Sequence, residues 1–194
     1  MTPRQPHSRR RVPAYTAVVL AFLALVGSLG LTTAASASAA PYCGITWGSL
    51  TKAGGVETAP NLTGVRTGRH DCYDRLVIDL RGGASAGYHV EYVTTVYHDP
   101  KGSVVPLRGG ARLQVVVHAP SYSLDGHPTY IPANPSELAN VSGYRTFRQV
   151  AYAGSFEGQT TVGLGVRARL PFRAFILAGP DGGSRLVVDV AHLW

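Results

Sequence analysis

Helical periodicity is absent from most of this sequence. Beyond residue 39, no stretch of ten residues repeats its apolar positions with the period of 3.6 that marks an amphipathic helix, which excludes a helical domain. Instead, 23 glycines and 13 prolines separate short runs in which apolar and polar residues alternate. Such runs are typical of antiparallel sheets. The sequence therefore predicts an all-β fold, a single-domain antiparallel β-sandwich.

Metal-binding and nucleophile motifs are also absent. The histidines beyond residue 39 are His70, His89, His98, His118, His127 and His192. None of them has the closely spaced histidine, cysteine or carboxylate partners of a zinc site. We therefore expect no metal, no cofactor, and histidines that are solvated or lie at hairpin edges. The segment Gly-Ala-Ser-Ala-Gly at 83–87 fits the nucleophile-elbow pattern, but β-patterned residues follow it where the elbow needs a helix.

Carboxylates that could work as a catalytic pair are scarce. Glu157 is the one acid flanked by glycines, aromatics and arginines, which makes it the first candidate for a functional carboxylate. Acid-base hydrolysis normally needs a second carboxylate at a defined distance. Asp79 and Asp189 lie within predicted strands, where we expect cross-strand ion pairs with Arg75 and Arg185. We predict that the protein is not an enzyme; a small secreted hydrolase that uses Glu157 is the less favoured alternative.

The first 39 residues have the pattern of a signal peptide. Arginines at 9–11 precede an apolar run at 15–31, and a small-residue cleavage site follows at 37–39. The twin-arginine pattern is only partial, so the export route, Sec or twin-arginine, stays open. An uncleaved membrane anchor is the alternative, although the apolar run is short for a bilayer span. We expect a secreted or cell-wall-associated protein that touches the membrane only if this segment is not cleaved.

Without residues 1–39, the chain is only mildly positive. Those residues hold four of the 18 basic residues and none of the 11 acidic ones, which leaves a net charge of +3. A charge this small, outside the cell, argues against a nucleic-acid partner. Lys52 and Lys101 are the only lysines. Arginine forks suit carboxylates and phosphates, although a high-G+C genome also favours arginine.

Two cysteines, Cys43 and Cys72, lie in the exported part. An even number of cysteines in an oxidising compartment predicts a disulfide. This bond would tether an irregular, strand-free leader at 40–60 to the domain. The predicted organisation is therefore a signal peptide at 1–39, the leader at 40–60 and a β-sandwich domain at 61–194.

Residues 74–80 and 184–190 carry matching strand patterns. We interpret this repeat as a sign of pseudo-symmetric sheets. The residues of the first copy that are predicted to face one side together are Leu76, Ile78 and Leu80. The turn sequence Gly-Pro-Asp-Gly-Gly at 179–183 predicts a hairpin that joins a strand at 172–177 to the second copy.

The densest cluster of groups able to bind a ligand lies at 144–177. Apolar residues occupy every second position of 162–172, which predicts a strand with one buried face and one wet, cationic face. Interleaved cations and aromatics suit a polymer with carboxylates and sugar faces. The predicted binding residues are Arg145, Arg148, Tyr152, Phe156, Glu157, Arg167 and Arg169. Phe147 is expected in the core, and the Pro-rich stretch 119–143 is expected to be an ordered flap.

Four segments resemble the AMIN-like domain of secreted actinobacterial proteins. They are residues 43–49, 66–77, 156–167 and 186–192, and the third is the most specific. The resemblance implies a relation to the AMIN domain, a small β-sandwich that accompanies cell-wall amidases and envelope secretion pores at peptidoglycan. It implies a non-catalytic envelope module whose partner is peptidoglycan, another cell-wall polymer or an envelope protein. A second, zinc-binding catalytic half like that of the amidases is not expected here.

Overall fold

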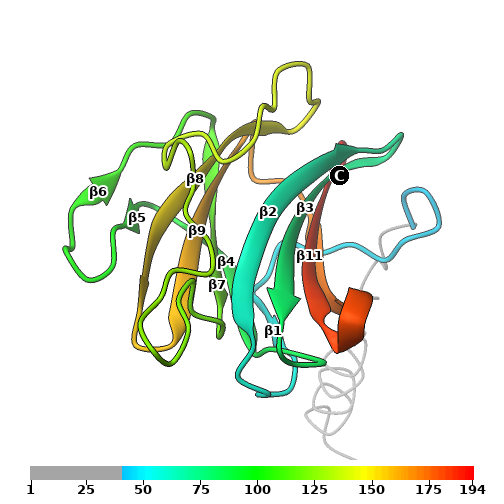
Figure 1. The fold of residues 1–194 in the computed structure, drawn as a ribbon. Coiled ribbons are helices and arrows are strands. Elements are labelled where there is room, and N and C mark those ends of the chain that lie inside the picture. Colours follow the sequence, from blue (N-terminus) through cyan, green and yellow to red (C-terminus); the bar gives the residue numbers. More distant parts are fainter. Residues whose placement is uncertain (1–40) are drawn as a thin grey trace, which may run out of the picture. The chain divides into compact units, whose positions relative to one another are not determined.

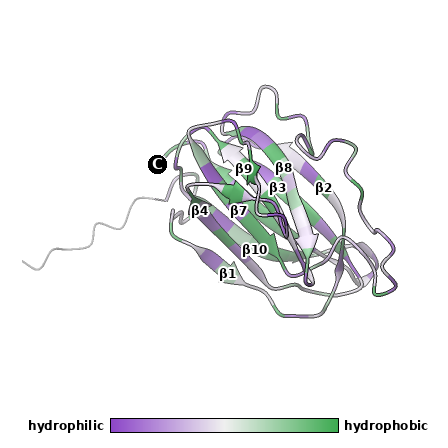
Figure 2. Cartoon of the chain, turned by 90° about the vertical axis from the view of Figure 1, so that its left-hand side faces the viewer, coloured by the Kyte–Doolittle hydropathy of each residue, from purple (hydrophilic) through white to green (hydrophobic). Residues whose placement is uncertain are grey.

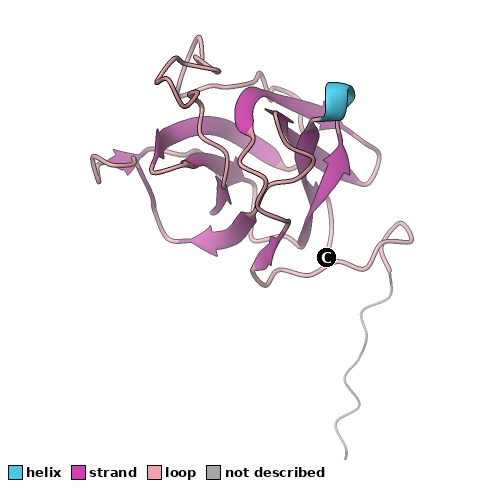
Figure 3. Ribbon diagram, turned by 60° about the horizontal axis from the view of Figure 1, so that its bottom comes forward, coloured by secondary structure: helices cyan, strands magenta, loops and turns pink. Residues whose placement is uncertain are grey.

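Two antiparallel sheets face each other (Figure 1). The structure is a computed structural model that describes residues 41–194. One sheet has five strands in the order β1-β4-β7-β9-β8, and the other has four in the order β10-β11-β3-β2. Within the described residues the only helical element is a short 3-10 turn at Pro180–Gly182 (Figure 3). The predicted all-β antiparallel sandwich is confirmed.

A disulfide ties the N-terminal part of the described chain to the sandwich. The bond between Cys43 and Cys72 is present, as predicted. The leader contains a short strand, β1 (Lys52–Gly54), which pairs with β4 (Tyr88–Val93). The expectation of a strand-free leader was therefore wrong for these residues. The predicted signal peptide at 1–39 lies outside the described residues, and within 41–194 no helix is long and apolar enough to cross a bilayer.

The five-stranded sheet buries one face of alternating side chains. Its other strands are β7 (Ala111–Val117), β9 (Gln159–Val166) and β8 (Phe147–Phe156). On β7, Leu113, Val115 and Val117 are fully buried, and most of this strand is apolar in Figure 2. The period of two in the sequence thus places every second side chain in the core.

The four-stranded sheet closes the other side of the core. Its strands are β10 (Phe172–Ala178), β11 (Ser184–Ala191), β3 (Tyr73–Arg81) and β2 (Asn61–Arg69). The predicted inward residues Leu76, Ile78 and Leu80 all belong to the core. The predicted hairpin is confirmed, since β10 pairs with β11 through the 3-10 turn. The two matching segments are neighbours in this one sheet rather than parts of two pseudo-symmetric sheets.

Strand β9 does not have the predicted wet, cationic face. Residues 160–166 are all buried, because β9 is internal to its sheet and a small hairpin of β5 (Val96–Tyr97) and β6 (Val104–Val105) lies outside it. At Gly165, a Cβ would lie 2.1 Å from the backbone carbonyl oxygen of Arg108, so only glycine fits there. The strand ends at Val166, and the arginines expected on it lie in the connection to β10.

The Pro-rich stretch 119–143 closes the sandwich between its edge strands β8 and β2. At β8, the backbone N–H of Tyr152 donates to the carbonyl of Pro135 at 2.7 Å. At β2, the N–H of Leu62 donates to the carbonyl of Pro120 at 2.8 Å. Open strand edges are prone to pair with other chains, and this flap occupies both. Its predicted role as an ordered flap agrees with these hydrogen bonds.

Candidate functional site

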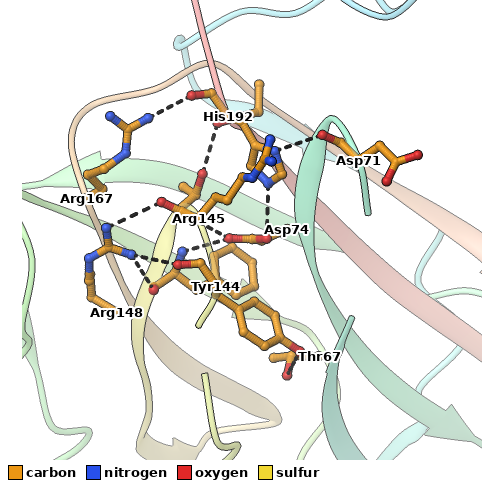
Figure 4. A network of polar contacts seen from close by, with 11 residues as sticks. Thr67, Asp71, Asp74, Tyr144, Arg145, Arg148, Arg167 and His192 are labelled. Carbon is orange, nitrogen blue, oxygen red and sulfur yellow. Dashed lines mark hydrogen bonds and ion pairs between the residues drawn. The ribbon is translucent and has the colours of Figure 1, made fainter. Parts of the chain in front are cut away.

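A buried aspartate at the start of β3 joins the two sheets. Asp74 is 1% exposed. Its Oδ2 accepts hydrogen bonds from the backbone N–H groups of Thr146 at 2.6 Å and Phe147 at 3.0 Å, where β8 of the other sheet begins (Figure 4). A buried carboxylate needs such donors, because an unpaired charge away from water is costly. Asp74 thereby fixes the start of β8 against β3.

His192 uses both of its ring nitrogens inside the protein. The residue is 4% exposed, so the expectation of solvated histidines is wrong for this one. Its Nε2 lies 3.1 Å from Asp74 Oδ1, and its Nδ1 lies 3.1 Å from the carbonyl oxygen of Asp71. The carbonyl oxygen of His192 accepts a hydrogen bond from Arg167 at 2.7 Å. This arrangement connects the end of β11 to both β3 and the β9–β10 connection.

The Asp74–His192 pair forms part of the wall of a cleft of about 590 Å³. The residues that line it, called the arginine cleft below, are Arg69, His70, Asp71, Asp74, Gly143, Arg145 and His192. Arg69 and Arg145 are exposed, and within 41–194 neither forms an ion pair. The Arg69 guanidinium lies 5.9 Å from the ring of Tyr144. These two exposed guanidinium groups are therefore free to donate hydrogen bonds to a carboxylate or phosphate ligand.

A second cleft, of about 410 Å³, meets the arginine cleft at Gly143. Arg148 lines it and donates hydrogen bonds to three backbone carbonyls within 144–147 (Figure 4). Its guanidinium therefore holds the turn before β8 in shape. On another wall, the hydrogen bond to Glu137 raises the pKa of Arg108. The arginines of this cleft are thus more fully partnered than those of the arginine cleft.

The predicted binding residues do not form one site. Arg145, Arg148 and Arg167 gather around the start of β8 (Figure 4). Phe156 and Glu157 lie at the other end of this ten-residue strand, roughly 30 Å away at 3.3 Å per residue. A single small ligand could not reach both groups. Binding by any of these residues stays a prediction.

Tyr152 and Arg169, also predicted to bind, have partners within the fold. The Tyr152 hydroxyl lies 2.7 Å from Oγ of Ser121, a residue of the flap. The Arg169 guanidinium lies 4.8 Å from the ring of Tyr92. Phe147 is 1% exposed, which confirms its expected place in the core.

Glu157 lies in the turn between β8 and β9 and lines a third cleft together with Glu57. Asp79 and Asp189 are the two other carboxylates that a hydrolase using Glu157 could employ. Both face away from the core on the four-stranded sheet. They form the expected ion pairs with Arg185 and Arg75. Neither aspartate lines the cleft of Glu157, so a second carboxylate there would have to be Glu57.

The sequence interpretation missed Arg69, Asp74 and His192. All three lie in segments that carry the family resemblance, 66–77 and 186–192, and that was the only signal for them. Asp74 and His192 are 118 residues apart, so no local motif could join them. Within 41–194, no group of three or more His, Cys, Asp and Glu side chains could hold a metal ion.

Comparison with protein families gives a match to the AMIN-like domain over residues 60–192. The matched region contains every strand of the two sheets except β1. It also contains the whole lining of the arginine cleft. Searches of curated proteins and of solved structures found no match. Because the family match covers more than half of the 194 residues, the chain belongs to the AMIN-like domain family.

Proposed function

We propose that the protein is a non-catalytic module of the cell envelope that binds peptidoglycan or another anionic cell-wall polymer through the arginine cleft. Family membership supports a cell-wall-related role. The observation that carries the choice of surface is the pair of exposed guanidinium groups of Arg69 and Arg145. Within the described residues both lack an ion-pair partner.

A polymer with repeated carboxylates or phosphates fits this surface. Each guanidinium can donate two parallel N–H bonds to such a group. The neighbouring cleft, which shares Gly143, extends the surface and adds Asn140 and Ser142 to its lining. A chain lying across Gly143 would contact both clefts, whereas a small anion would occupy only one.

The hydrogen bonds that the Asp74–His192 pair already makes within the protein support a non-catalytic role. Both ring nitrogens of His192 already face oxygen atoms of the protein. The second carboxylate oxygen of Asp74 accepts two backbone N–H bonds. A general base needs a free atom within hydrogen-bond reach of its substrate, and this pair has none.

A location outside the cytoplasm is supported by the disulfide between Cys43 and Cys72. Such bonds persist in oxidising compartments and are rare in the cytosol. The signal-peptide pattern at 1–39 supports the same location. We place the proposed binding at the cell wall.

The test is co-sedimentation of the purified protein with cell-wall sacculi at low and high salt. The variants are Arg69→Ala and Arg145→Ala. The matched control is Arg81→Ala, an exposed arginine at the end of β3 that lies outside the arginine cleft. Pelleting is expected to fall with salt, because ions screen contacts between exposed charges. Each cleft variant should weaken binding about fivefold, and the control should not, because one exposed charge contact is worth up to about 1 kcal/mol.

Two results would contradict this proposal. Equal losses in all three variants would assign binding to total charge instead of the arginine cleft. No pelleting at either salt concentration would remove the polymer as ligand and would direct the search to an envelope protein.

A further inference from the structure

A cleft of about 690 Å³ lies where β8 turns into β9, at the opposite end of β8 from the arginine cleft. Its walls come from three parts of the chain that are distant in sequence. The leader contributes Glu57, the flap contributes Tyr122 and Leu124, and the β8–β9 turn contributes Glu157. The function proposed above makes no use of this surface.

The charge of this cleft is opposite to that of the chain. Glu57 and Glu157 line it, and no lysine or arginine within 41–194 does, although the whole sequence carries a formal charge of +7. Glu57 Oε1 contacts His118 Nδ1. Glu157 forms no ion pair within the described residues. A cation is therefore the complementary ligand.

The flap wall of the cleft is held in place before any ligand arrives. The carbonyl oxygen of Tyr122 accepts a hydrogen bond from Asn61 Nδ2 at 2.6 Å. Its hydroxyl oxygen accepts one from the backbone N–H of Gly158 at 3.3 Å. Tyr122 thus spans from β2 to the β8–β9 turn. A preformed wall spares a ligand the entropic cost of ordering it.

An apolar surface accompanies the carboxylates. Leu124, at the tip of the flap, is fully exposed, and Tyr122 and Pro120 line the same cleft. A side chain with an aliphatic stem and a charged end can cover apolar surface with its stem and keep its charge at a polar rim. An ammonium group on a chain of methylenes matches this combination, while a compact inorganic cation matches only the carboxylates.

We propose that this cleft binds a peptide through a side chain that ends in a primary ammonium group. The methylene stem lies against Tyr122 and Leu124, and the ammonium group pairs with Glu157. The proposal does not rest on the arginine cleft, because the two clefts are at opposite ends of β8. Either can fail without the other.

The test is a two-dimensional NMR titration of the purified protein with the probe acetyl-Ala-Lys-Ala-amide. The matched probe carries an acetyl group on the lysine nitrogen and has no charge. The variant is Glu157→Gln. Its control is Glu91→Gln, because Glu91 is another glutamate with a partly exposed side chain and it lies outside the cleft.

Amide signals of residues 121–126 and 157–159 should shift on binding. The uncharged probe should bind about tenfold more weakly. Glu157→Gln should raise the dissociation constant about fivefold, the effect of one partly exposed charge pair, and Glu91→Gln should leave it unchanged.

Equal binding of the two probes would overturn the proposal, as would equal effects of the two glutamate variants. Shifts confined to other parts of the chain, or no binding, would also overturn it. Binding of glucosamine in place of the peptide would assign the cleft to an amino sugar. Sacculus pelleting in the Arg69→Ala and Arg145→Ala variants reports on the other cleft, so the two failures are distinguishable.

Discussion

Arg75 faces Asp189 across strands β3 and β11, and its Nε and Nη2 donate to the two carboxylate oxygens at 2.6 and 2.9 Å. Further along the same strands, Arg185 faces Asp79 with its Nε 3.4 Å from Oδ1, while Arg66 of β2 donates to both carboxylate oxygens of Asp79 at 2.8 and 3.0 Å. The two matching sequence segments are therefore antiparallel neighbours centred on the Val77–Val187 pair. Because each segment has its arginine and aspartate four positions apart, this pairing sets the arginine of one against the aspartate of the other.

The two aspartates of this repeat should differ in their effect on stability. Asp189 is fully buried and also accepts a hydrogen bond from Arg173 at 2.8 Å. Asp189→Ala would leave Arg75 and Arg173 without their carboxylate and should lower the free energy of unfolding by about 3 kcal/mol. Asp79, with a side chain 29% exposed, is the matched control, and Asp79→Ala should cost less than about 1 kcal/mol. Urea unfolding measures both, and equal losses would contradict the prediction.

The disulfide should contribute much of the stability of the domain. It closes a sequence separation of 29 residues between Cys43 and Cys72. Loop-closure entropy for a separation of this size corresponds to about 3.6 kcal/mol. The double variant Cys43→Ser/Cys72→Ser should therefore unfold at a much lower urea concentration than the wild type. An unchanged midpoint for the double variant would show that the disulfide adds nothing to stability.

The sequence was sufficient to predict the strands that have one buried face and one exposed face. Leu76, Ile78 and Leu80 alternate with polar residues and all enter the core, as predicted. The same rule failed for β9. The β5–β6 hairpin covers its second face, and that packing comes from residues more than fifty positions away. The alternation at 162–166 therefore does not mark a solvent-exposed face. Its glycines, Gly163 and Gly165, leave space for the β5–β6 segment to pack on the second face of β9.

The candidate site could be predicted less well than the fold. Arg145 was found because it belongs to a local cluster of cations and aromatics. Arg69, which lines the arginine cleft with it, is the last residue of β2. Only the fold brings these two arginines, 76 positions apart in the sequence, to the same cleft. Local spacing carries no information on such pairs. Glu157 was identified as a single carboxylate, but Glu57 on the same cleft was missed, since the leader reads as irregular.

Glu157 occupies a backbone conformation that suits asparagine or glycine better. It has φ of 48° and Gly158 has φ of 79°, which makes a two-residue hairpin turn with both central residues left-handed. Glu157→Asn should raise the free energy of unfolding by about 1 kcal/mol, because left-handed glutamate is strained. The same variant removes the charge from the cleft of Glu157, so stability and ligand binding should change in opposite directions. Thermal unfolding measures the stability effect.

Gly158→Ala is the matching control for this turn. No atom lies within 4 Å of the Cβ that it would add, so its effect is purely conformational. It should lower the free energy of unfolding by about 1 kcal/mol. A lower stability for Glu157→Asn would show that the glutamate makes a contact that compensates for its backbone conformation.

Tyr92 should make stability fall at high pH. Its hydroxyl donates to the carbonyl oxygen of Leu170 at 2.7 Å and accepts from the N–H of Leu170 at 2.9 Å. Burial raises the pKa of Tyr92 from 10.0 to about 12. Tyrosine in the unfolded chain ionises at the lower value. The stability that the neutral phenol contributes is therefore complete below pH 10 and is lost as the pH rises through 12.

Urea unfolding of the wild type and of Tyr92→Phe between pH 8 and 12 tests this expectation. At pH 8 the variant should be less stable by about 1 kcal/mol, because the hydrogen bonds to Leu170 are lost. The wild type should then lose about 2 kcal/mol more than the variant by pH 12, after allowance for partial exposure. Other groups that titrate in this range act on both proteins alike and cancel in the difference. Parallel curves would show that folding does not raise the pKa of Tyr92.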